Sequence, residues 1–438
     1  MTGLPDGWER VRFEEMVARD APIIYGILQP GPEYPAGVKY VRPSEIQDGV
    51  IDLKSVRSTS PKIAAQYERS KLAAGDIILS IVGTIGKVAL VPNALDGANI
   101  TQSSCRLRPD RNLTDEGFLQ HFLKAPQAVE QYDRKRMGTA VPRLNLADVR
   151  QFEIPLPPLP EQRRIVRKLD TLSARSATAR SHLTGIENLV EWYKLAFYLE
   201  VFAAPQQQVE LGTIAKVGTG ATPKKGVAKY YANGTVPWVT SGAVNAKTVT
   251  KPSSFITKTA IQETNCKVFP TGSLLMAMYG EGKTRGQVAR LEIAAATNQA
   301  LAVIHDLDET RIDTEYLFRF LDSIYLEIRE QAEGGVQPNL SLGKVKTFKV
   351  PLPTLDEQRE IVRRIETAFA KIDRLAAEAA KALRLLSRLD QRILAKAFAG
   401  NLVPQDPNDE PADRLLERIR QERANGTPTK RKRRQADG

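Results

Sequence analysis

Several residue types and patterns are scarce in this chain of 438 residues. It has two cysteines, Cys105 and Cys266, which lie far apart and form no CxxC pair. That scarcity excludes a disulfide framework or a cysteine zinc site, and it predicts a cytoplasmic protein in a reducing environment. No stretch approaches ~18 consecutive apolar residues, so no membrane span is expected. The N-terminal segment also lacks the apolar run of a signal peptide.

Motifs that would support catalysis or metal binding are also missing. The three histidines, His121, His182 and His305, are isolated and form no HxH or HxxxH pattern. No aspartate lies between Asp170 and Asp306, which removes aspartate-based acid–base pairs from most of that region. The [DN]PP[YF] tetrad of amino-methyltransferases and a strand-linked GxGxxG are absent. We therefore expect a binding protein with no metal site and no catalytic residues.

Positive charge is in excess. The formal net charge is +12 and the sequence pI is about 9.5, while the hydrophobic content of 42% is ordinary for a globular protein. Residues 206–305 contain eleven Lys or Arg against four Glu and no Asp. This balance favours a polyanionic partner such as a nucleic acid, the alternative being a merely basic surface.

The chain repeats itself at an offset of 196 residues. Residues 154–167 read IPLPPLPEQRRIVR and residues 350–363 read VPLPTLDEQREIVR, with ten of fourteen positions identical. The upstream segments 138–157 and 334–353 correspond at the same offset. The repeat is far longer than a solenoid unit of ~20–50 residues, so it predicts two copies of one domain-plus-helix module.

The repeat divides the chain into five parts. Short strand-like runs alternate with helical stretches in both globular regions, which predicts an α+β fold. The predicted parts are a first recognition domain (1–153), a central boundary and long helix (154–205), a second recognition domain (206–349), a distal boundary and long helix (350–400) and a polar, basic tail (401–438). The tail contains a candidate short helix at 412–423 and five consecutive cations at 430–434, which either contact phosphate or form a solvated end.

Each long helix carries an apolar stripe at heptad spacing. The stripes predict that the two helices pair as an antiparallel coiled coil under an internal pseudo-twofold. The alternative, in which each helix packs on its own domain, conflicts with a length of ~65 Å. The predicted pairing residues are Ile165, Leu169, Leu172, Leu183, Ile186, Val190, Ile361, Ile365, Ile372, Leu375, Leu386, Leu389 and Ile393.

Candidate DNA contacts are loop-like residues with cationic or amide side chains, because Arg, Lys, Gln and Asn read base edges and neutralise phosphates. For each one taken alone, a solvated surface role is the competing interpretation. The candidates are Arg57, Lys87, Arg134, Lys135, Arg136, Lys224, Lys225, Lys283, Arg285, Gln337 and Asn339.

Over nearly its whole length the chain resembles the specificity subunit of type I restriction–modification systems. The motifs that carry the resemblance are the twice-repeated PLPxLxEQRxIVR boundary, the segment GGVQPNLSLGKVKTFKVPLP and the distal segment ILAKAFAGNLVPQDPNDEPADRLLERI at 393–419. The first helix departs from the pattern, with EWYKLAFYLEVFA where the second ends QRILAKAFAGNLV. That departure concerns the local contacts of the helix end.

The resemblance implies a non-catalytic subunit in which each domain reads half of a bipartite DNA target and the paired helices fix the gap. It implies docking of two methyltransferase (M) subunits and recruitment of restriction (R) subunits. S-adenosylmethionine, ATP and Mg would then be bound by those partners and no cofactor by this chain. The alternatives are a related type II methyltransferase–nuclease partner, or a coiled-coil scaffold whose heads bind proteins.

Overall fold

The computed structural model describes residues 3–138, 141–203, 207–279, 284–325 and 340–425. The chain forms two compact units, each of which combines segments that are distant in sequence. The first unit comprises 1–183 and 381–438, and the second comprises 184–380. Each unit therefore contains one globular domain and a portion of both long helices.

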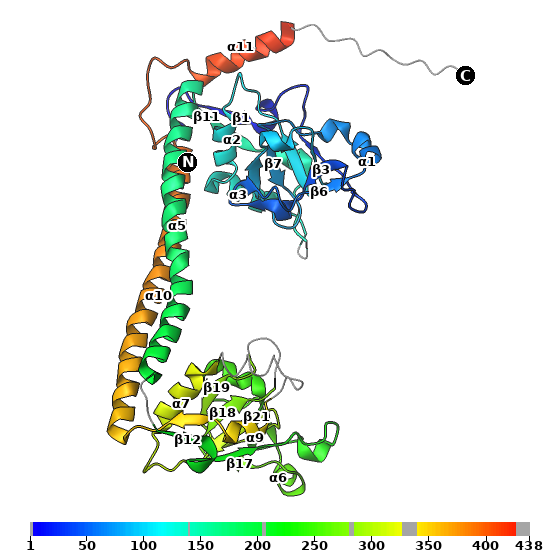
Figure 1. Ribbon diagram of the computed structural model, residues 1–438. Coiled ribbons are helices and arrows are strands. Elements are labelled where there is room, and N and C mark those ends of the chain that lie inside the picture. The colour runs from blue at the N-terminus through cyan, green and yellow to red at the C-terminus, as the bar shows by residue number, and fades with distance from the viewer. Residues whose placement is uncertain (1–2, 139–140, 204–206, 280–283, 326–339, 426–438) are drawn as a thin grey trace, which may run out of the picture. The chain divides into compact units, whose positions relative to one another are not determined.

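The globular domain of the first unit is α+β (Figure 1). Its strands form a four-stranded sheet in the order β2-β10-β7-β8, a three-stranded sheet β6-β3-β9, and the pairs β1-β11 and β4-β5. The strands are β1 Glu9–Arg12, β2 Ile24–Tyr25, β3 Val38–Val41, β4 Ile46–Gln47, β5 Val50–Ile51, β6 Arg57–Thr59, β7 Ile77–Ser80, β8 Val88–Leu90, β9 Asn99–Ile100, β10 Ser104–Leu107 and β11 Glu153–Leu156. The helices are α1 Pro61–Gln66, α2 Glu116–Phe122, α3 Pro126–Lys135 and α4 Leu146–Arg150.

The globular domain of the second unit has related sheets. A five-stranded sheet has the order β13-β21-β18-β19-β15, a four-stranded sheet has the order β16-β14-β20-β17, and β12 pairs with β22. The strands are β12 Gln208–Glu210, β13 Lys216–Thr219, β14 Val236–Val239, β15 Thr248–Val249, β16 Ser254–Ile256, β17 Val268–Phe269, β18 Leu274–Ala277, β19 Val288–Leu291, β20 Ala295–Thr297, β21 Leu301–His305 and β22 Lys349–Pro351. The helices are α6 Lys258–Glu263, α7 Thr314–Ser323 and α9 Leu342–Lys346.

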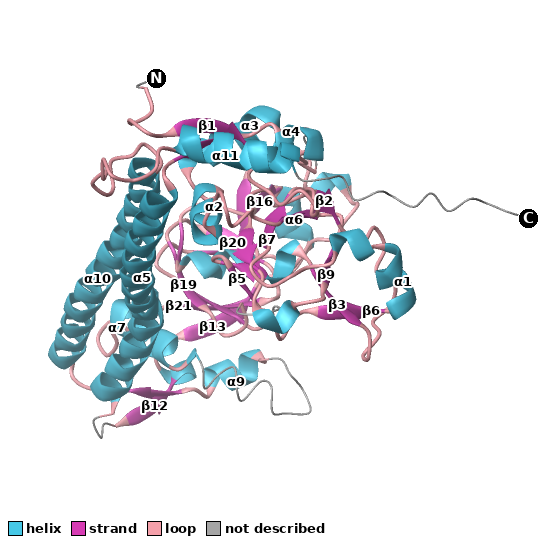
Figure 2. Ribbon diagram, turned by 90° about the horizontal axis from the view of Figure 1, so that it is seen from above, coloured by secondary structure: helices cyan, strands magenta, loops and turns pink. Residues whose placement is uncertain are grey.

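The long helices are α5 (Leu159–Phe202) and α10 (Leu355–Ala397), which lie side by side in Figures 1 and 2. In the first unit, Ser176 and Arg180 of α5 contact Asp390 of α10 at 2.6 and 3.0 Å, and Arg180 also reaches Ser387.

In the second unit, Lys194 of α5 pairs with Asp373 of α10 at 2.6 Å, and Glu200 pairs with Arg364 at 3.4 Å. In both units the α10 partner moves towards lower numbers as α5 advances, so the helices run antiparallel.

The predicted apolar stripe holds best near the start of each helix. Ile165, Leu169, Ile361, Ile365, Ile372 and Val190 are buried, and Leu172, Leu183, Ile186, Leu386 and Ile393 are partly buried. The prediction is wrong for Leu375 and Leu389, whose side chains are 60% and 51% exposed. Burial continues at Ala379, one heptad after Ile372, whereas Leu375 and Leu389, which share the other heptad position, project into solvent.

Part of the predicted polar tail belongs to the core of the first unit. Helix α11 (Ala412–Asn425) buries Ala412, Leu415, Leu416 and Ile419 within the main cluster of that unit. Its Ala412 amide donates to the Gly7 carbonyl at 2.9 Å, which joins the two ends of the described chain. The run of cations at 430–434 lies outside the described residues.

The contrast between the buried Ile372 and the exposed Leu375 gives a direct test of helix pairing. We expect Ile372→Asp to lower the free energy of unfolding by about 3 kcal/mol, because it places a charge at a buried site. Leu375→Asp, at an exposed site on the same helix, should change it by less than ~0.5 kcal/mol. Denaturant unfolding of the purified chain measures both; equal effects would contradict the observed pairing face.

Candidate nucleic-acid interface

A buried glutamine joins each recognition domain to the long helix that follows it. Gln162, near the start of α5, accepts hydrogen bonds from the Thr114 hydroxyl (3.1 Å) and the Asp115 amide (3.0 Å). Its side-chain amide donates to the carbonyls of Leu113 and Pro157. The side chain is fully buried and uses both ends of its amide, so it fixes how the first domain sits on α5.

The same clamp recurs in the second unit. Gln358, 196 residues later, accepts from the Asp313 amide at 2.7 Å and donates to the carbonyls of Arg311 and Pro353. The adjacent glutamates differ. Glu357 completes a capping box with Thr354, whereas Glu161 accepts from the indole of Trp8.

An aromatic contact fastens the other long helix to each domain. In the first unit, Phe398, directly after α10, packs edge-on against Phe118 and Phe122 of α2, with ring centroids 5.2 Å apart in both cases. In the second unit, Phe202 at the end of α5 packs against Tyr316 and Phe320 of α7 at 5.7 and 5.5 Å.

Phe202 and Phe398 lie 196 residues apart in the chain. The divergent end of the first helix thus keeps the aromatic residue that makes this contact, although its surrounding sequence has changed.

Each junction between a domain and its long helix also contains a pair of a basic and an acidic residue, but the residue types differ between the two units. His121 of α2 lies 2.8 Å from Asp170 of α5, and the corresponding residues Arg319 and Glu366 lie 3.9 Å apart in the second unit. Burial lowers the pKa of His121, and the hydrogen bond to Asp170 opposes that shift. The first junction therefore contains a titratable histidine where the second unit has an arginine.

The predicted cations of the first domain lie on its surface or near it. Arg57 in β6 is exposed. Lys87 is half-buried and donates to the Pro43 carbonyl at 2.9 Å. The three at the end of α3 form exposed ion pairs, namely Arg134 with Glu130, Lys135 with Asp148, and Arg136 with Asp133. Exposed pairs of this kind are worth ~0–1 kcal/mol, so a phosphate group can displace them.

The predicted cations of the second domain are only partly described. Lys224 and Lys225 are exposed in the loop that precedes residues 228–230. Arg285 is half-buried. Lys283, Gln337 and Asn339 lie outside the described residues. The described candidates therefore remain predictions as DNA contacts. The expectation that they lie in loops is wrong for Arg57, which is in β6, and for Arg134 and Lys135, which are in α3.

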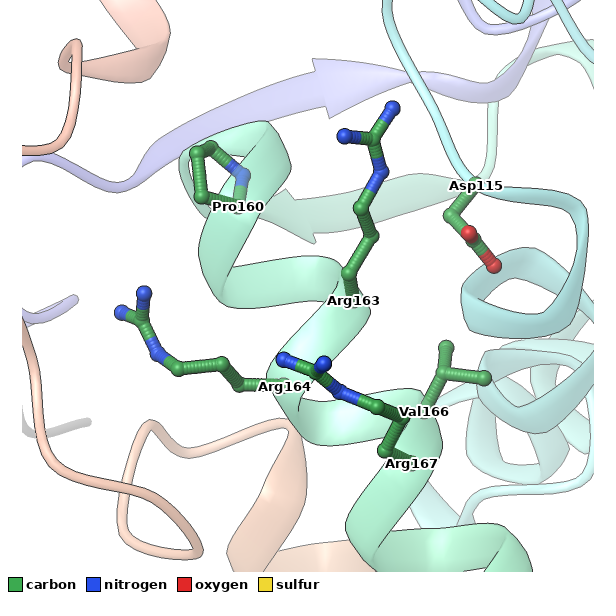
Figure 3. Close-up of a pocket in the computed structure, with 6 residues that line it drawn as sticks. All are labelled: Asp115, Pro160, Arg163, Arg164, Val166 and Arg167. Atoms are coloured by element: carbon green, nitrogen blue, oxygen red, sulfur yellow. The ribbon is translucent and has the colours of Figure 1, made fainter.

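A cationic pocket at the start of α5 was not predicted from the sequence (Figure 3). Arg163, Arg164 and Arg167 line a cavity of about 440 Å³ together with Asp115, Pro160 and Val166. Arg164 is paired with Asp409 at 2.7 Å. Arg163 and Arg167 are exposed and have no carboxylate partner among the described residues. The signal for this pocket is the run EQRRIVR at 161–167, which contains all three arginines and also belongs to the repeated boundary.

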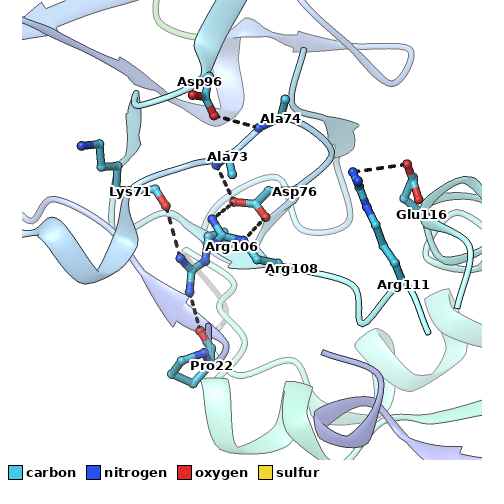
Figure 4. Close-up of polar contacts among 10 residues, drawn as sticks. All are labelled: Pro22, Lys71, Ala73, Ala74, Asp76, Asp96, Arg106, Arg108, Arg111 and Glu116. Atoms are coloured by element: carbon cyan, nitrogen blue, oxygen red, sulfur yellow. Dashed lines mark hydrogen bonds and ion pairs between the residues drawn. The ribbon is translucent and has the colours of Figure 1, made fainter. Parts of the chain in front are cut away.

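Other cations of the first domain are structural (Figure 4). Arg108 forms a two-pronged pair with the buried Asp76 at 2.7 and 2.8 Å. Arg106 in β10 is almost fully buried and donates to the carbonyls of Lys71 and Pro22. Arg106, in β10, and Arg108, directly after it, therefore tie this strand to neighbouring loops.

The described part of the chain gives no evidence for a metal site, a reactive cysteine or a membrane-spanning helix. No group of three metal-ligating side chains occurs among the described residues. Both cysteines are free and buried, and burial raises the pKa of the Cys105 thiol to about 12. No helix in the described ranges is long and apolar enough to cross a membrane.

Two similar α+β domains, each anchored by a glutamine clamp and an aromatic contact to the same pair of helices, define a tandem recognition protein. The sequence profile of the type I restriction modification DNA specificity domain matches residues 5–188 and 205–383. This chain belongs to that family. The predicted fold class and the predicted specificity-subunit role, which is not an enzymatic one, are confirmed by this match.

Individual relatives agree with the family assignment. The chain is 32% identical to the EcoBI specificity subunit of Escherichia coli over 171 residues, which are 39% of this chain and 36% of that protein. It is 25% identical to the EcoKI specificity subunit of Escherichia coli (strain K12) over 425 residues, 88% of each protein.

Two solved structures share the fold. A chain from structural work on complex assembly and conformational transition of the type I R-M system has a TM-score of 0.72 and 24% identity, covering 92% of this chain and 100% of that one. The HsdS subunit from Thermoanaerobacter tengcongensis has a TM-score of 0.57 and 23% identity, covering 91% and 98%.

The His121 junction predicts a pH-dependent stability. Because the folded state holds the His121 pKa below its ordinary value, it binds fewer protons than the unfolded chain near pH 6. The free energy of unfolding should therefore fall as pH falls through about 6.5. We expect His121→Gln to lose this component, seen as a smaller drop in melting temperature between pH 7.5 and pH 5.5.

His182→Gln, at an exposed position of α5, serves as the control and should follow the parent chain. Identical pH profiles for the parent and His121→Gln would show that the pKa of His121 is the same in the folded and unfolded states, which would contradict the prediction.

Proposed function

We propose that each recognition domain reads one half of a bipartite, asymmetric DNA sequence and that the paired helices set the gap between the halves. The observation that carries the proposal is the duplicated anchor: both domains are joined to the helices by a buried glutamine and an aromatic pair. Two separately anchored domains on one chain fit a ligand with two separate binding segments. The net charge of +12 suits a DNA ligand.

The proposal includes two methyltransferase subunits as partners. The last third of α5, in the second unit, exposes a row of large apolar side chains, with Leu189 67%, Trp192 75%, Tyr193 56% and Leu199 58% exposed. Contiguous exposed apolar surface marks interaction sites, and tryptophan is enriched where such sites bind most tightly.

The corresponding stretch of α10, in the first unit, exposes Leu385 and Leu389 at positions 196 residues after Leu189 and Tyr193. Two related surfaces suit two copies of one partner. The methyl donor S-adenosylmethionine, and the ATP and Mg used by restriction subunits, then belong to the partners, and this chain binds no cofactor.

The function is tested by mapping adenine methylation in single DNA molecules from cells that express the chain with its methyltransferase partner, and from cells that lack the chain. We expect a bipartite methylated motif only when the chain is present. If the same motifs occur in both cell types, or if a chain-dependent motif is continuous rather than bipartite, the proposal is wrong.

The partner surface is tested by Trp192→Ala. Removing a central interface tryptophan typically costs ~2 kcal/mol or more, so the affinity for the methyltransferase subunit should fall by about thirtyfold. Glu187→Ala, at an exposed position on a different face of α5, is the control and should bind normally. Titration of the purified chain with the partner measures both affinities, and unchanged binding by Trp192→Ala would exclude this surface.

A further inference from the structure

A four-residue turn occurs at the same place in both recognition domains. In the first domain it spans 101–104, between β9 and β10, and the Ser104 amide donates to the Thr101 carbonyl at 3.1 Å. In the second domain it spans 298–301, between β20 and β21, and the Leu301 amide donates to the Asn298 carbonyl at 3.4 Å. The second residue of each turn is a glutamine, Gln102 or Gln299.

Main-chain hydrogen bonds establish that the two turns correspond, independently of their side chains. The first residue of each turn donates its amide to the last residue of a parallel neighbouring strand. Thr101 donates to Val41 of β3 at 3.2 Å, and Asn298 donates to Val239 of β14 at 3.0 Å.

The third residue of each turn is held in the same way. The Ser103 carbonyl accepts from the Ile81 amide at 2.8 Å, and the Ala300 carbonyl accepts from the Met278 amide at 2.8 Å. Each turn is therefore fixed at its first, third and fourth residues.

A glycine packs against the strand that leads into each turn. A Cβ atom on Gly26 would lie 1.8 Å from the Ile100 carbonyl oxygen, and one on Gly220 would lie 1.8 Å from the Thr297 carbonyl oxygen. Neither glycine can be replaced without moving the backbone, so the approach to the turn is tightly packed in both domains.

Only the glutamine is common to the two turns. The other positions pair Thr101 with Asn298, Ser103 with Ala300 and Ser104 with Leu301. Both glutamines are exposed, whereas Ser104 and Leu301 are fully buried. Both turns therefore have the same main-chain hydrogen bonds and an exposed glutamine at the same position, although their other three side chains differ.

We propose that Gln102 and Gln299 are base-reading residues, each of which recognises an adenine in the DNA half-site read by its own domain. This inference rests on the proposed function and adds to it the side chain that makes the contact. A glutamine amide offers one donor and one acceptor, which match the N7 acceptor and N6 donor of adenine in the major groove. The rigid turns supply the fixed geometry that such a two-bond contact requires.

Local contacts are compatible with this role. The side-chain amide oxygen of Gln299 (Oε1) accepts from the Thr222 hydroxyl at 2.5 Å, which orients the plane of the side-chain amide. Thr222 lies two residues before the exposed Lys224 and Lys225, so cations suited to phosphate are close in sequence to the proposed base contact. The two glutamines belong to different units, and each should therefore affect one half-site alone.

The experiment maps methylated motifs in cells that carry the intact complex with Gln102→Ala, Gln102→Glu, Gln299→Ala or Gln299→Glu. The alanine variants should lose discrimination for adenine at one position of one half-site by about tenfold or more. The glutamate variants, which can only accept hydrogen bonds, should shift the preference at that position towards cytosine, whose N4 group donates. The half-site read by the other domain should stay unchanged.

The outcomes separate this inference from simpler ones. An unchanged motif and unchanged methylation rate in all four variants would mean that the glutamines are only solvated. A uniform loss of methylation over all sequences, or a change in both half-sites, would indicate a phosphate or structural role and would also overturn the inference. If the parent chain itself yields no bipartite motif, the proposed function fails, and this inference fails with it.

Discussion

The hydrogen bonds of one buried glutamine in each unit hold the rest of the architecture in place. Gln162 and Gln358 are fully buried and their amides bond to main-chain groups, so those groups must stay in position. Those groups lie just ahead of α2 and α7 and just ahead of the long helices. A change in the angle between domain and helix would leave several buried polar groups unpaired, which makes a fixed angle the stable one.

The two units share the contacts that join each domain to the long helices, and they differ in some of the residues around those contacts. The glutamine clamp, the aromatic pair and the acidic partner on the long helix recur in both units. The basic partner changes from His121 to Arg319, and the glutamate beside the clamp either binds Trp8 or caps its own helix. A duplicated frame with divergent details fits two domains that do the same task on different sequences.

Sequence patterns predicted the large features because those depend on periodicity and repetition. The 196-residue offset indicated two copies of one domain-plus-helix module, whereas the equivalence of Phe202 and Phe398 emerged only from their aromatic contacts. The heptad pattern failed at Leu375 and Leu389, because spacing alone does not show which of the two heptad positions faces solvent in this part of α10. The turns bearing Gln102 and Gln299 were not found, since their equivalence lies in main-chain hydrogen bonds and not in a shared run of letters. The burial of α11 was also missed, because its four apolar residues are scattered among charges.

In the proposed function, the helices measure the gap between two independent reading domains. The most direct test inserts seven residues of helical sequence into α5 after Leu183 and into α10 after Ala380, so that both helices lengthen together. Seven residues add about 10.5 Å, or about three base pairs of DNA. Motif mapping should then show both half-sites unchanged and a gap about three base pairs longer. An unchanged gap, or altered half-site sequences, would contradict the account.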